Sequence, residues 1–434
     1  MRFGVAKDII TPKAPMKLAC AGGEMEQNFL TIHDDVFVRC LVFDDGKKKA
    51  VLMSFDLLFH DRILNEVIAK YAEMKYGINP ATVVISYIHA HTAPASRGYN
   101  PGAHNDAYEE LLVSRAKDCL DRAMCSMFEG SVEYGTFDAD FNISRRGTRN
   151  GVYQIAPNDN YPHDTEVAVI CVKNMEGEVR SVVMNYACHP VFYPGTRGVS
   201  GEFPARLCQH MDLEYYGCTS LFFQSAGGDV RPRPTADIEN GKFNKMKFSD
   251  IDCFAKNICR SVCEFIESGL CEKKELSIAA DAFEIELPME PKPISYFEKY
   301  LEGRNVKEFN PNVVNAYHIV NGGYEKLERK LIVHGQIVRI AEYFFLATIG
   351  GEPCFGVKQI VKNSIAGKDV CFIGYTDSCA YIVDDRILSE GGYEPGCHLE
   401  YGLIGPFQPG LDEKYRESFK ASFHRLNAEW KQNK

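Results

Sequence analysis

The strongest constraint on the fold is the alternation of apolar runs with segments of helical periodicity. The run AVLMSFDLLF over residues 50–59 is followed by DRILNEVIAKYAEMKYG, whose apolar residues recur at helical spacing, and then by ATVVISYIHAH, residues 81–91. Short apolar runs favour strands, and Gly77 after the periodic segment is typical of a helix end. The sequence therefore predicts a strand, a helix and a second strand over residues 50–91.

The same alternation continues along the whole chain. Helical patterns cover 106–127, 203–217, 249–269, about 295–335 and 412–430, and strand patterns cover 131–144, 166–174, 178–190, 220–230, 336–352 and 369–383. Strands alternating with helices predict an α/β fold, a mixed sheet with helices on both faces. No repeat or flexible linker divides the chain. We therefore expect a single domain over 1–434, with a lid or subdomain within 290–335.

Composition narrows the classes of function. The chain carries 49 basic and 59 acidic residues, a formal charge of -10, which disfavours nucleic acid as a partner because that binding relies on basic patches. No apolar run reaches the roughly 20 residues that a membrane-spanning helix needs, and the first residues do not resemble a secretory signal. The 16 cysteines are scattered and are typical of buried, reduced thiols. We therefore expect a cytoplasmic protein; its oligomeric state is not indicated.

Polar residues close three of the apolar runs. ISYIHAH ends with His89 and His91, VVMNYACHP places His189 near its end, and YFFLATIGGE ends with Glu352. If residues 81–91 form a strand, His89 and His91 project from one face, because side chains alternate along a strand. Histidines with a carboxylate are the usual ligands of a catalytic zinc ion. The same side chains are equally compatible with a hydrogen-bonded polar patch, so spacing alone leaves both interpretations open.

A resemblance to a known family favours the metal site. The chain is similar to the neutral/alkaline, non-lysosomal ceramidases in seven short segments, which follow in the family's order: GVAKDIITP, SYIHAHTAP, FNISRR, NYACHPVF, FFQSAGGDVRP, GGEP and GYTDSCAYIVDDRILSEGGYEPG. The resemblance implies a ceramidase-like catalytic domain and a place in lipid metabolism. It also implies a zinc-dependent amidohydrolase, since that family cleaves the N-acyl bond of ceramide.

The resemblance also assigns the metal ligands. It implies one Zn²⁺ per chain, held by His89 of the HAH segment, His189 of ACHP, Glu352 of GGEP and Tyr381. Tyr381 is favoured over Tyr375 because its interval to the tyrosine of GGYEP fits the family's pair of site tyrosines.

Three further residues are implied to act around the metal. His91 and Tyr393 would contact the water or the oxyanion, and Arg145 of NISRR corresponds to the family's site arginine, with Arg146 as the alternative. The mechanism so implied is attack of metal-activated water on an amide of a small-molecule or lipid-like substrate.

The sequence departs from the family at three places. Arg231 stands where the family has a serine required for activity, and Glu390 stands where it has a tyrosine. The chain also ends about where the catalytic domain would end, so we expect no C-terminal immunoglobulin-like domain. An arginine prefers an anionic partner, so Arg231 predicts a smaller or anionic substrate. Its alternative role is a structural ion pair with Asp229 or Glu202.

Other functions remain compatible with the sequence. An esterase or lactonase would use the same metal site, and a catalytically inactive homologue would only bind a metal or ligand. A serine hydrolase would instead use Ser225 of QSAGGD as its nucleophile, although the glycine expected two residues earlier is missing.

Overall fold

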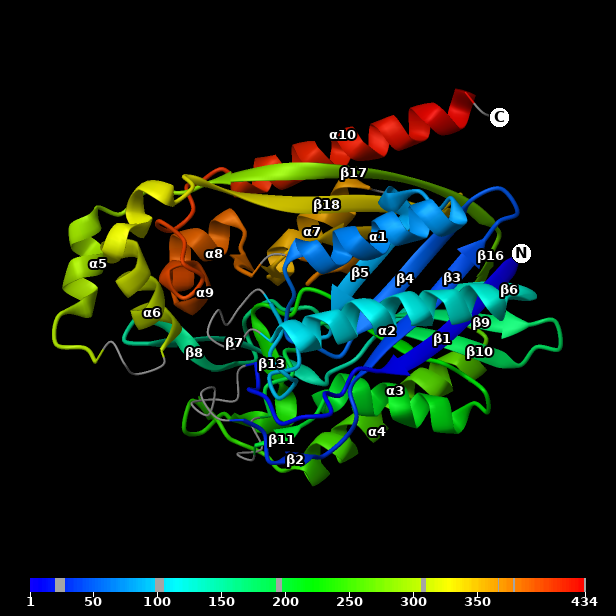
Figure 1. Ribbon diagram of the computed structural model, residues 1–434, viewed down its shortest axis with the longest axis horizontal. Coiled ribbons are helices and arrows are strands. Elements are labelled where there is room, and N and C mark those ends of the chain that lie inside the picture. Colours follow the sequence, from blue (N-terminus) through cyan, green and yellow to red (C-terminus); the bar gives the residue numbers. More distant parts are fainter. Residues whose placement is uncertain are drawn as a thin grey trace.

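The computed structural model describes residues 1–19, 28–97, 105–192, 197–305, 310–365, 367–377 and 379–432. Two large sheets pack face to face, and helices cover both outer faces (Figure 1). The predicted α/β class with helices on both faces is confirmed, with the helices distributed over a pair of sheets.

The larger sheet has nine strands in the order β12-β10-β9-β6-β1-β3-β4-β5, with β16 beside β6. It is mixed, because β4 and β5 run parallel, as do β10 and β12, whereas the other neighbours are antiparallel. Its strands are β1 (Arg2–Ile9), β3 (Phe37–Asp44), β4 (Lys49–Phe55), β5 (Val83–Tyr87), β6 (Phe128–Asp138), β9 (Glu166–Asn174), β10 (Val179–Tyr186), β12 (Leu221–Gln224) and β16 (Glu272–Lys274).

The second sheet has four strands, β17 (Leu276–Pro288), β18 (Lys330–Ala341), β19 (Phe344–Ile349) and β21 (Asp369–Ile373). The prediction of one strand over 336–352 was wrong, because Glu342 and Tyr343 form a turn and the segment is the β18–β19 hairpin. Alternation along β4 explains the packing: Leu52 enters the core between the sheets, and Val51 faces the outer helices. Both sheet faces are therefore buried.

Six long helices complete the outer layers. The nine-stranded sheet is covered by α1 (Arg62–Tyr76), α2 (Asp106–Cys125), α3 (Glu202–Glu214) and α4 (Phe248–Glu267), and the four-stranded sheet by α7 (Phe355–Ser364) and α10 (Leu411–Gln432). Figure 1 shows α10 lying along β17. Helix α1 ends as the sequence predicts, because Gly77 adopts φ 65° and its N–H caps the last turn.

Smaller elements form one end of the molecule. They include β7 (Asn142–Arg149), β8 (Val152–Asn158), β13 (Val230–Pro232), β20 (Glu352–Pro353), β22 (Tyr381–Ile382), α5 (Ile294–Leu301), α6 (Pro311–His318), α8 (Asp385–Glu390) and α9 (Tyr393–Gly396). Figure 1 shows α5 and α6 at this end, near α8 and α9. Phe297 of α5 and Ala316 of α6 form a small core with Ile319 and Leu399. This unit falls in the predicted lid over 290–335, of which 306–309 lie outside the described residues, and a lid function stays a prediction.

The nine-stranded sheet curves so that its two ends meet. The hydroxyl of Ser54 in β4 donates to the carbonyl of Phe222 in β12 at 2.7 Å. At the end of β12, the side-chain amide of Gln224 donates to the carbonyls of Ile88 at 3.1 Å and Cys188 at 2.8 Å. Gln224 therefore ties together the segments that follow β5 and β10, each one residue before a candidate histidine.

Two further features concern the cysteines and the polarity of the helices. The 15 described cysteines form no disulfide, and most of them are buried. Within the described ranges, every helix is too short or too polar to cross a membrane.

Candidate metal centre and active site

The chain leaves the sheet just before the two neighbouring histidines. Strand β5 ends at Tyr87, and His89 has φ 66°, a left-handed conformation that non-glycine residues rarely adopt. The prediction that both histidines lie on one strand was therefore wrong. The N–H of His89 donates to the carbonyl of Leu57 at 2.9 Å, and its ring packs between Phe59 and Tyr375. These contacts stabilise the strained backbone, which is a common feature of functional sites.

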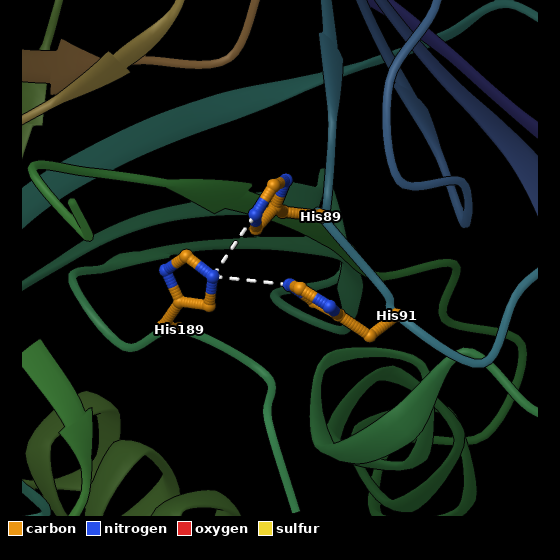
Figure 2. Close-up of side chains that lie close together, drawn as sticks. All are labelled: His89, His91 and His189. Carbon is orange, nitrogen blue, oxygen red and sulfur yellow. Dashed lines mark hydrogen bonds between the residues drawn. The ribbon is translucent and has the colours of Figure 1, made fainter. Parts of the chain in front are cut away.

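Three imidazoles nevertheless converge. The Nε2 atom of His189 lies 3.1 Å from Nε2 of His89 and 3.0 Å from Nε2 of His91, as Figure 2 shows. All three residues are buried, and their nitrogens form a group compact enough to hold one metal ion. His91, which the sequence placed near the metal, thus lies as close to His189 as the predicted ligand His89 does.

The remaining ring nitrogens reveal the tautomers. Nδ1 of His89 faces the carbonyl oxygen of Leu58 at 3.2 Å, and Nδ1 of His189 faces the carbonyl oxygen of Gly227 at 3.2 Å. A carbonyl oxygen only accepts, so each Nδ1 carries a proton, and each ring is held with its Nε2 atom toward the cluster. Burial, then the nearby His89 and Arg145, hold the pKa of His189 well below its usual value, so its ring is neutral.

The spacing of the Nε2 atoms also suits a metal site. A tetrahedral site with bonds of about 2.0–2.1 Å separates its ligand atoms by roughly 3.3 Å, close to the distances observed here. Donation of Nδ1–H to a backbone carbonyl is also the usual outer contact of a metal-binding histidine. The residues present therefore fit a divalent metal ion.

Glu352 adds a carboxylate to the cluster. Its Oε2 lies 3.1 Å from Nε2 of His89, and its Oε1 accepts a 2.6 Å hydrogen bond from the hydroxyl of Tyr401. Burial raises the pKa of Glu352, but His89, Tyr401 and Arg145 outweigh burial and bring the pKa below its ordinary value. The residue is therefore an anion at neutral pH. Sequence reasoning missed Tyr401, because nothing in the sequence around it signals a role.

Tyr381 lies beside this carboxylate. Strand β22 runs parallel to β20, and the register places Tyr381 next to Glu352. Its ring lines the cavity over the histidines. The centre of this ring lies 5.6 Å from the ring centre of Tyr393 and 5.9 Å from that of Tyr401. The structure thus brings Tyr381 to the site, and its ligation of the metal stays a prediction.

Arg145 and Tyr393 close another side of the cavity. Arg145 donates through Nε to Glu394 at 2.9 Å, and its guanidinium lies 5.0 Å from the ring centre of Tyr381. The hydroxyl of Tyr393 donates to Glu400 at 3.0 Å. Burial raises the pKa of Tyr381 and Tyr393 well above the usual value, so both hydroxyls stay protonated. All three side chains therefore carry donor hydrogens, and in this structure Tyr393 gives its own to Glu400.

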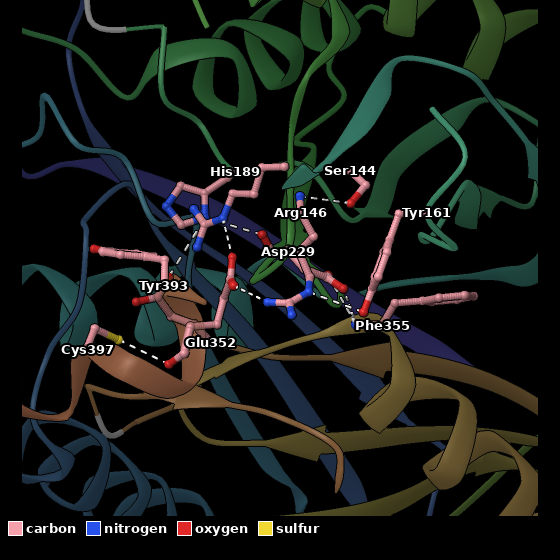
Figure 3. A network of polar contacts seen from close by, with 12 residues as sticks. Ser144, Arg146, Tyr161, His189, Asp229, Glu352, Phe355, Tyr393 and Cys397 are labelled. Carbon is pink, nitrogen blue, oxygen red and sulfur yellow. Dashed lines mark hydrogen bonds and ion pairs between the residues drawn. The ribbon is translucent and has the colours of Figure 1, made fainter. Parts of the chain in front are cut away.

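Arg146 serves a neighbouring ion-pair network instead. It donates to Glu394 at 2.5 Å and to Glu390 at 3.1 Å, and the hydroxyl of Tyr161 also donates to Glu390 at 2.6 Å. Figure 3 shows this network around Arg146 and Tyr161. Arg145 lines the cavity and Arg146 does not, so the geometry favours Arg145 as the site arginine.

Arg231, which the resemblance aligns with a serine of the ceramidases, also lines the cavity. Its guanidinium carbon lies 4.9 Å from the ring centre of Phe243 in β15 (Lys242–Phe243). Each of the two carboxylates considered as structural partners accepts a backbone hydrogen bond. Asp229 accepts from the N–H of Phe355 at 3.2 Å, and Glu202 accepts from the N–H of Phe192 at 3.2 Å.

Two alternative residues lie outside the cavity. Tyr375 is buried with its ring centre 4.7 Å from that of His89, so it supports the histidine. Ser225 is buried too, and its hydroxyl donates at 2.9 Å to Asp164, which also pairs with Lys358 at 2.7 Å. A serine that donates to a carboxylate away from the cavity is not placed to act as a nucleophile.

The cavity over the histidines is small. It measures about 70 Å³ and is lined by Leu58, Phe59, His89, His91, Arg145, Ile155, His189, Arg231, Glu352, Tyr381, Tyr393, Glu400 and Tyr401. A larger cavity of about 520 Å³ lies between α1 and the paired strands β17 and β18. We assign the chemistry to the smaller cavity, because the converging nitrogens line it.

The comparisons with known proteins concern the fold. Neither a scan against protein-family models nor a search of curated proteins finds a match. Among solved structures, neutral ceramidase from Pseudomonas aeruginosa superposes with a TM-score of 0.73 at 15% identity, over 98% of this chain and 75% of that one. A ceramidase complexed with C2 gives 0.73 at 14% identity, over 99% and 75%. The chain therefore has the fold of the neutral ceramidases over nearly its whole length.

Proposed function

We propose that this protein is a zinc-dependent hydrolase that cleaves the N-acyl bond of a small amide. One observation carries the proposal: the Nε2 atoms of His89 and His189 lie 3.1 Å apart, with the carboxylate of Glu352 at 3.1 Å from the same His89 nitrogen. Arg145 and Tyr393 line the same buried cavity as these residues. The neutral-ceramidase fold supports the same reaction class.

His89, His189, Glu352 and Tyr381 are the proposed ligands of one zinc ion. A zinc ion held there lowers the pKa of water to about 7 and polarises an acyl carbonyl. Nitrogen ligands with carboxylate and phenol oxygens suit zinc, and manganese or iron are the competitors for such a set. The carboxylate of Glu352 is oriented by Tyr401, and each histidine by a backbone carbonyl.

The surrounding residues move protons and stabilise charge. We assign to His91 the acceptance of the proton from the attacking water, because its Nε2 faces the cluster. Arg145 donates to the oxyanion, and Tyr393 does so when its hydroxyl turns from Glu400, at roughly 3 kcal/mol for each well-placed donor. The water oxygen joins the acyl carbon and the C–N bond breaks. The proton passes to the amine, which leaves beside a carboxylic acid.

The reduced cysteines support a cytoplasmic location for this hydrolase. Its proposed partner is a small or lipid-like amide, with no nucleic acid, in keeping with the net charge of -10.

The test is hydrolysis of a panel of N-acyl amides and matched esters by protein stripped of metal and then reloaded with zinc. We expect amide cleavage that chelation abolishes and zinc restores. Cleavage of esters alone would assign an esterase to the same site, and zinc binding without any turnover would identify a catalytically inactive homologue. His91→Ala should keep its zinc and lose turnover, whereas loss of zinc would make His91 a ligand.

A further inference from the structure

Arg231 and Arg145 share one wall of the cavity. Strand β13 pairs antiparallel with β7, and the register sets Arg231 opposite Ile143, two residues before Arg145. Strand β7 has an irregularity between Ser144 and Arg146, so the direction of Arg145 follows from the cavity that it lines and not from alternation along the strand. Both line the cavity over the histidines. The two guanidinium groups therefore face the same space.

The charge of this wall favours an anion. Two lining side chains are permanently cationic, Arg145 and Arg231, and two are acidic, Glu352 and Glu400. The lining charges balance, and Glu394 behind Arg145 adds one negative charge, so a divalent ion held by the histidines would leave the site with a positive excess. In a buried site such an excess attracts a negatively charged ligand.

The size of the cavity limits what can enter. Pockets for drug-sized ligands have volumes of about 300–1,000 Å³, against about 70 Å³ here. The part of the substrate that lies between the histidines and Arg231 must therefore be compact.

Phe243 fixes the orientation of Arg231. The guanidinium packs on the ring of Phe243, with 4.9 Å between its carbon and the ring centre. A guanidinium carries N–H groups in one plane, and this planar fork matches the two oxygens of a carboxylate.

We infer that Arg231 recognises a carboxylate of the substrate, which makes a short N-acyl amino acid the substrate class of this hydrolase. The inference rests on the proposed function, because it assigns the substrate of the same site. In this arrangement Arg231 binds the carboxylate, and the amide lies between Arg231 and the histidines.

The test compares N-acetylglycine with N-ethylacetamide, in which a methyl group replaces the carboxylate. We expect zinc-loaded wild type to favour N-acetylglycine by about 100-fold in kcat/KM, because an arginine–carboxylate pair in a buried site is worth several kcal/mol. Arg231→Ser should lose most of this preference, chiefly through KM. Arg231→Lys keeps the charge but not the paired N–H groups, and should retain part of it.

Arg233→Ser is the matched control. It removes the same charge two residues along the chain, where Arg233 pairs with Asp140 and Asp159 outside the cavity. This variant should keep the wild-type preference. An equal preference in wild type and Arg231→Ser would overturn the inference while leaving the hydrolase intact.

A binding measurement makes the result independent of turnover. Calorimetry of N-acetylglycine with the zinc-loaded proteins should show at least tenfold weaker binding to Arg231→Ser than to Arg233→Ser. Equal affinities would overturn the inference. If wild type binds N-acetylglycine through Arg231 but cleaves no amide, the proposed function fails and the anion site stands. Circular dichroism confirms that each variant is folded.

Discussion

His89 and His189 face each other through their Nε2 atoms across 3.1 Å, while each ring is held from behind by a backbone carbonyl. Both rings are buried, so their Nε2 atoms need a partner other than bulk water. A cation bound by both nitrogens would supply that partner. The left-handed backbone at His89 forms part of the turn that brings its ring to this position.

Tyr401 should tune the affinity for the metal. Its hydroxyl donates to Glu352 at 2.6 Å, and contacts of this kind orient a ligand and are worth about 10–100-fold in metal affinity. We expect Tyr401→Phe to weaken zinc binding by about that factor, measured by competition with a chelator of known affinity. Tyr324→Phe removes a hydroxyl that bonds the carbonyl of Lys292 far from the cluster, and should bind zinc like wild type. Equal affinities in both variants would contradict an orienting role.

Ser225 should be dispensable for catalysis. Its hydroxyl is buried against Asp164, so Ser225→Ala removes one hydrogen bond and costs about 1 kcal/mol of unfolding free energy. Activity should stay at the wild-type level, and a serine-reactive phosphonate should have no effect. A fall of a thousandfold or more in kcat with intact folding would instead support a serine nucleophile.

His60 should make stability depend on pH. Burial lowers its pKa, but hydrogen bonds to Asp61 and Glu109 outweigh burial and raise the pKa from 6.5 to about 9. The folded protein thus holds a proton that the unfolded chain releases at lower pH. This stabilisation is complete below about pH 6.5 and is lost as the pH rises toward 9, on the order of 3 kcal/mol in total.

The measurement is the unfolding free energy of wild type and His60→Gln from denaturant titrations across this pH range. Wild type should lose stability relative to the variant as the pH rises. A difference between the two proteins that stays constant with pH would show that His60 does not carry the proton.

The sequence predicted the elements better than their assembly. The strand, helix and strand over 50–91 exist, because apolar alternation and Gly77 act locally. The division into two sheets was not predictable, because strands of both sheets, such as β4 and β19, are buried on both faces and read alike as continuous apolar runs. The turn that divides residues 336–352 consists of Glu342 and Tyr343 alone, so the apolar residues on both sides of it were interpreted as one strand.

The site shows the same limit. The resemblance supplied His89, His189 and Glu352, and the structure brings them together. The reason first given for pairing His89 with His91 does not hold, because β5 ends at Tyr87 and the two rings meet through a turn fixed by Leu57. Such a turn depends on tertiary contacts, and the sequence does not encode it locally.

Metal analysis of purified protein tests the central claim most directly. The comparison is between wild type, His189→Ala and His210→Ala, which removes an imidazole paired with Asp252 away from the cluster. We predict one zinc ion per chain in wild type and in His210→Ala, and a stoichiometry near zero in His189→Ala. A His189→Ala protein that is folded and carries as much zinc as wild type would contradict the account.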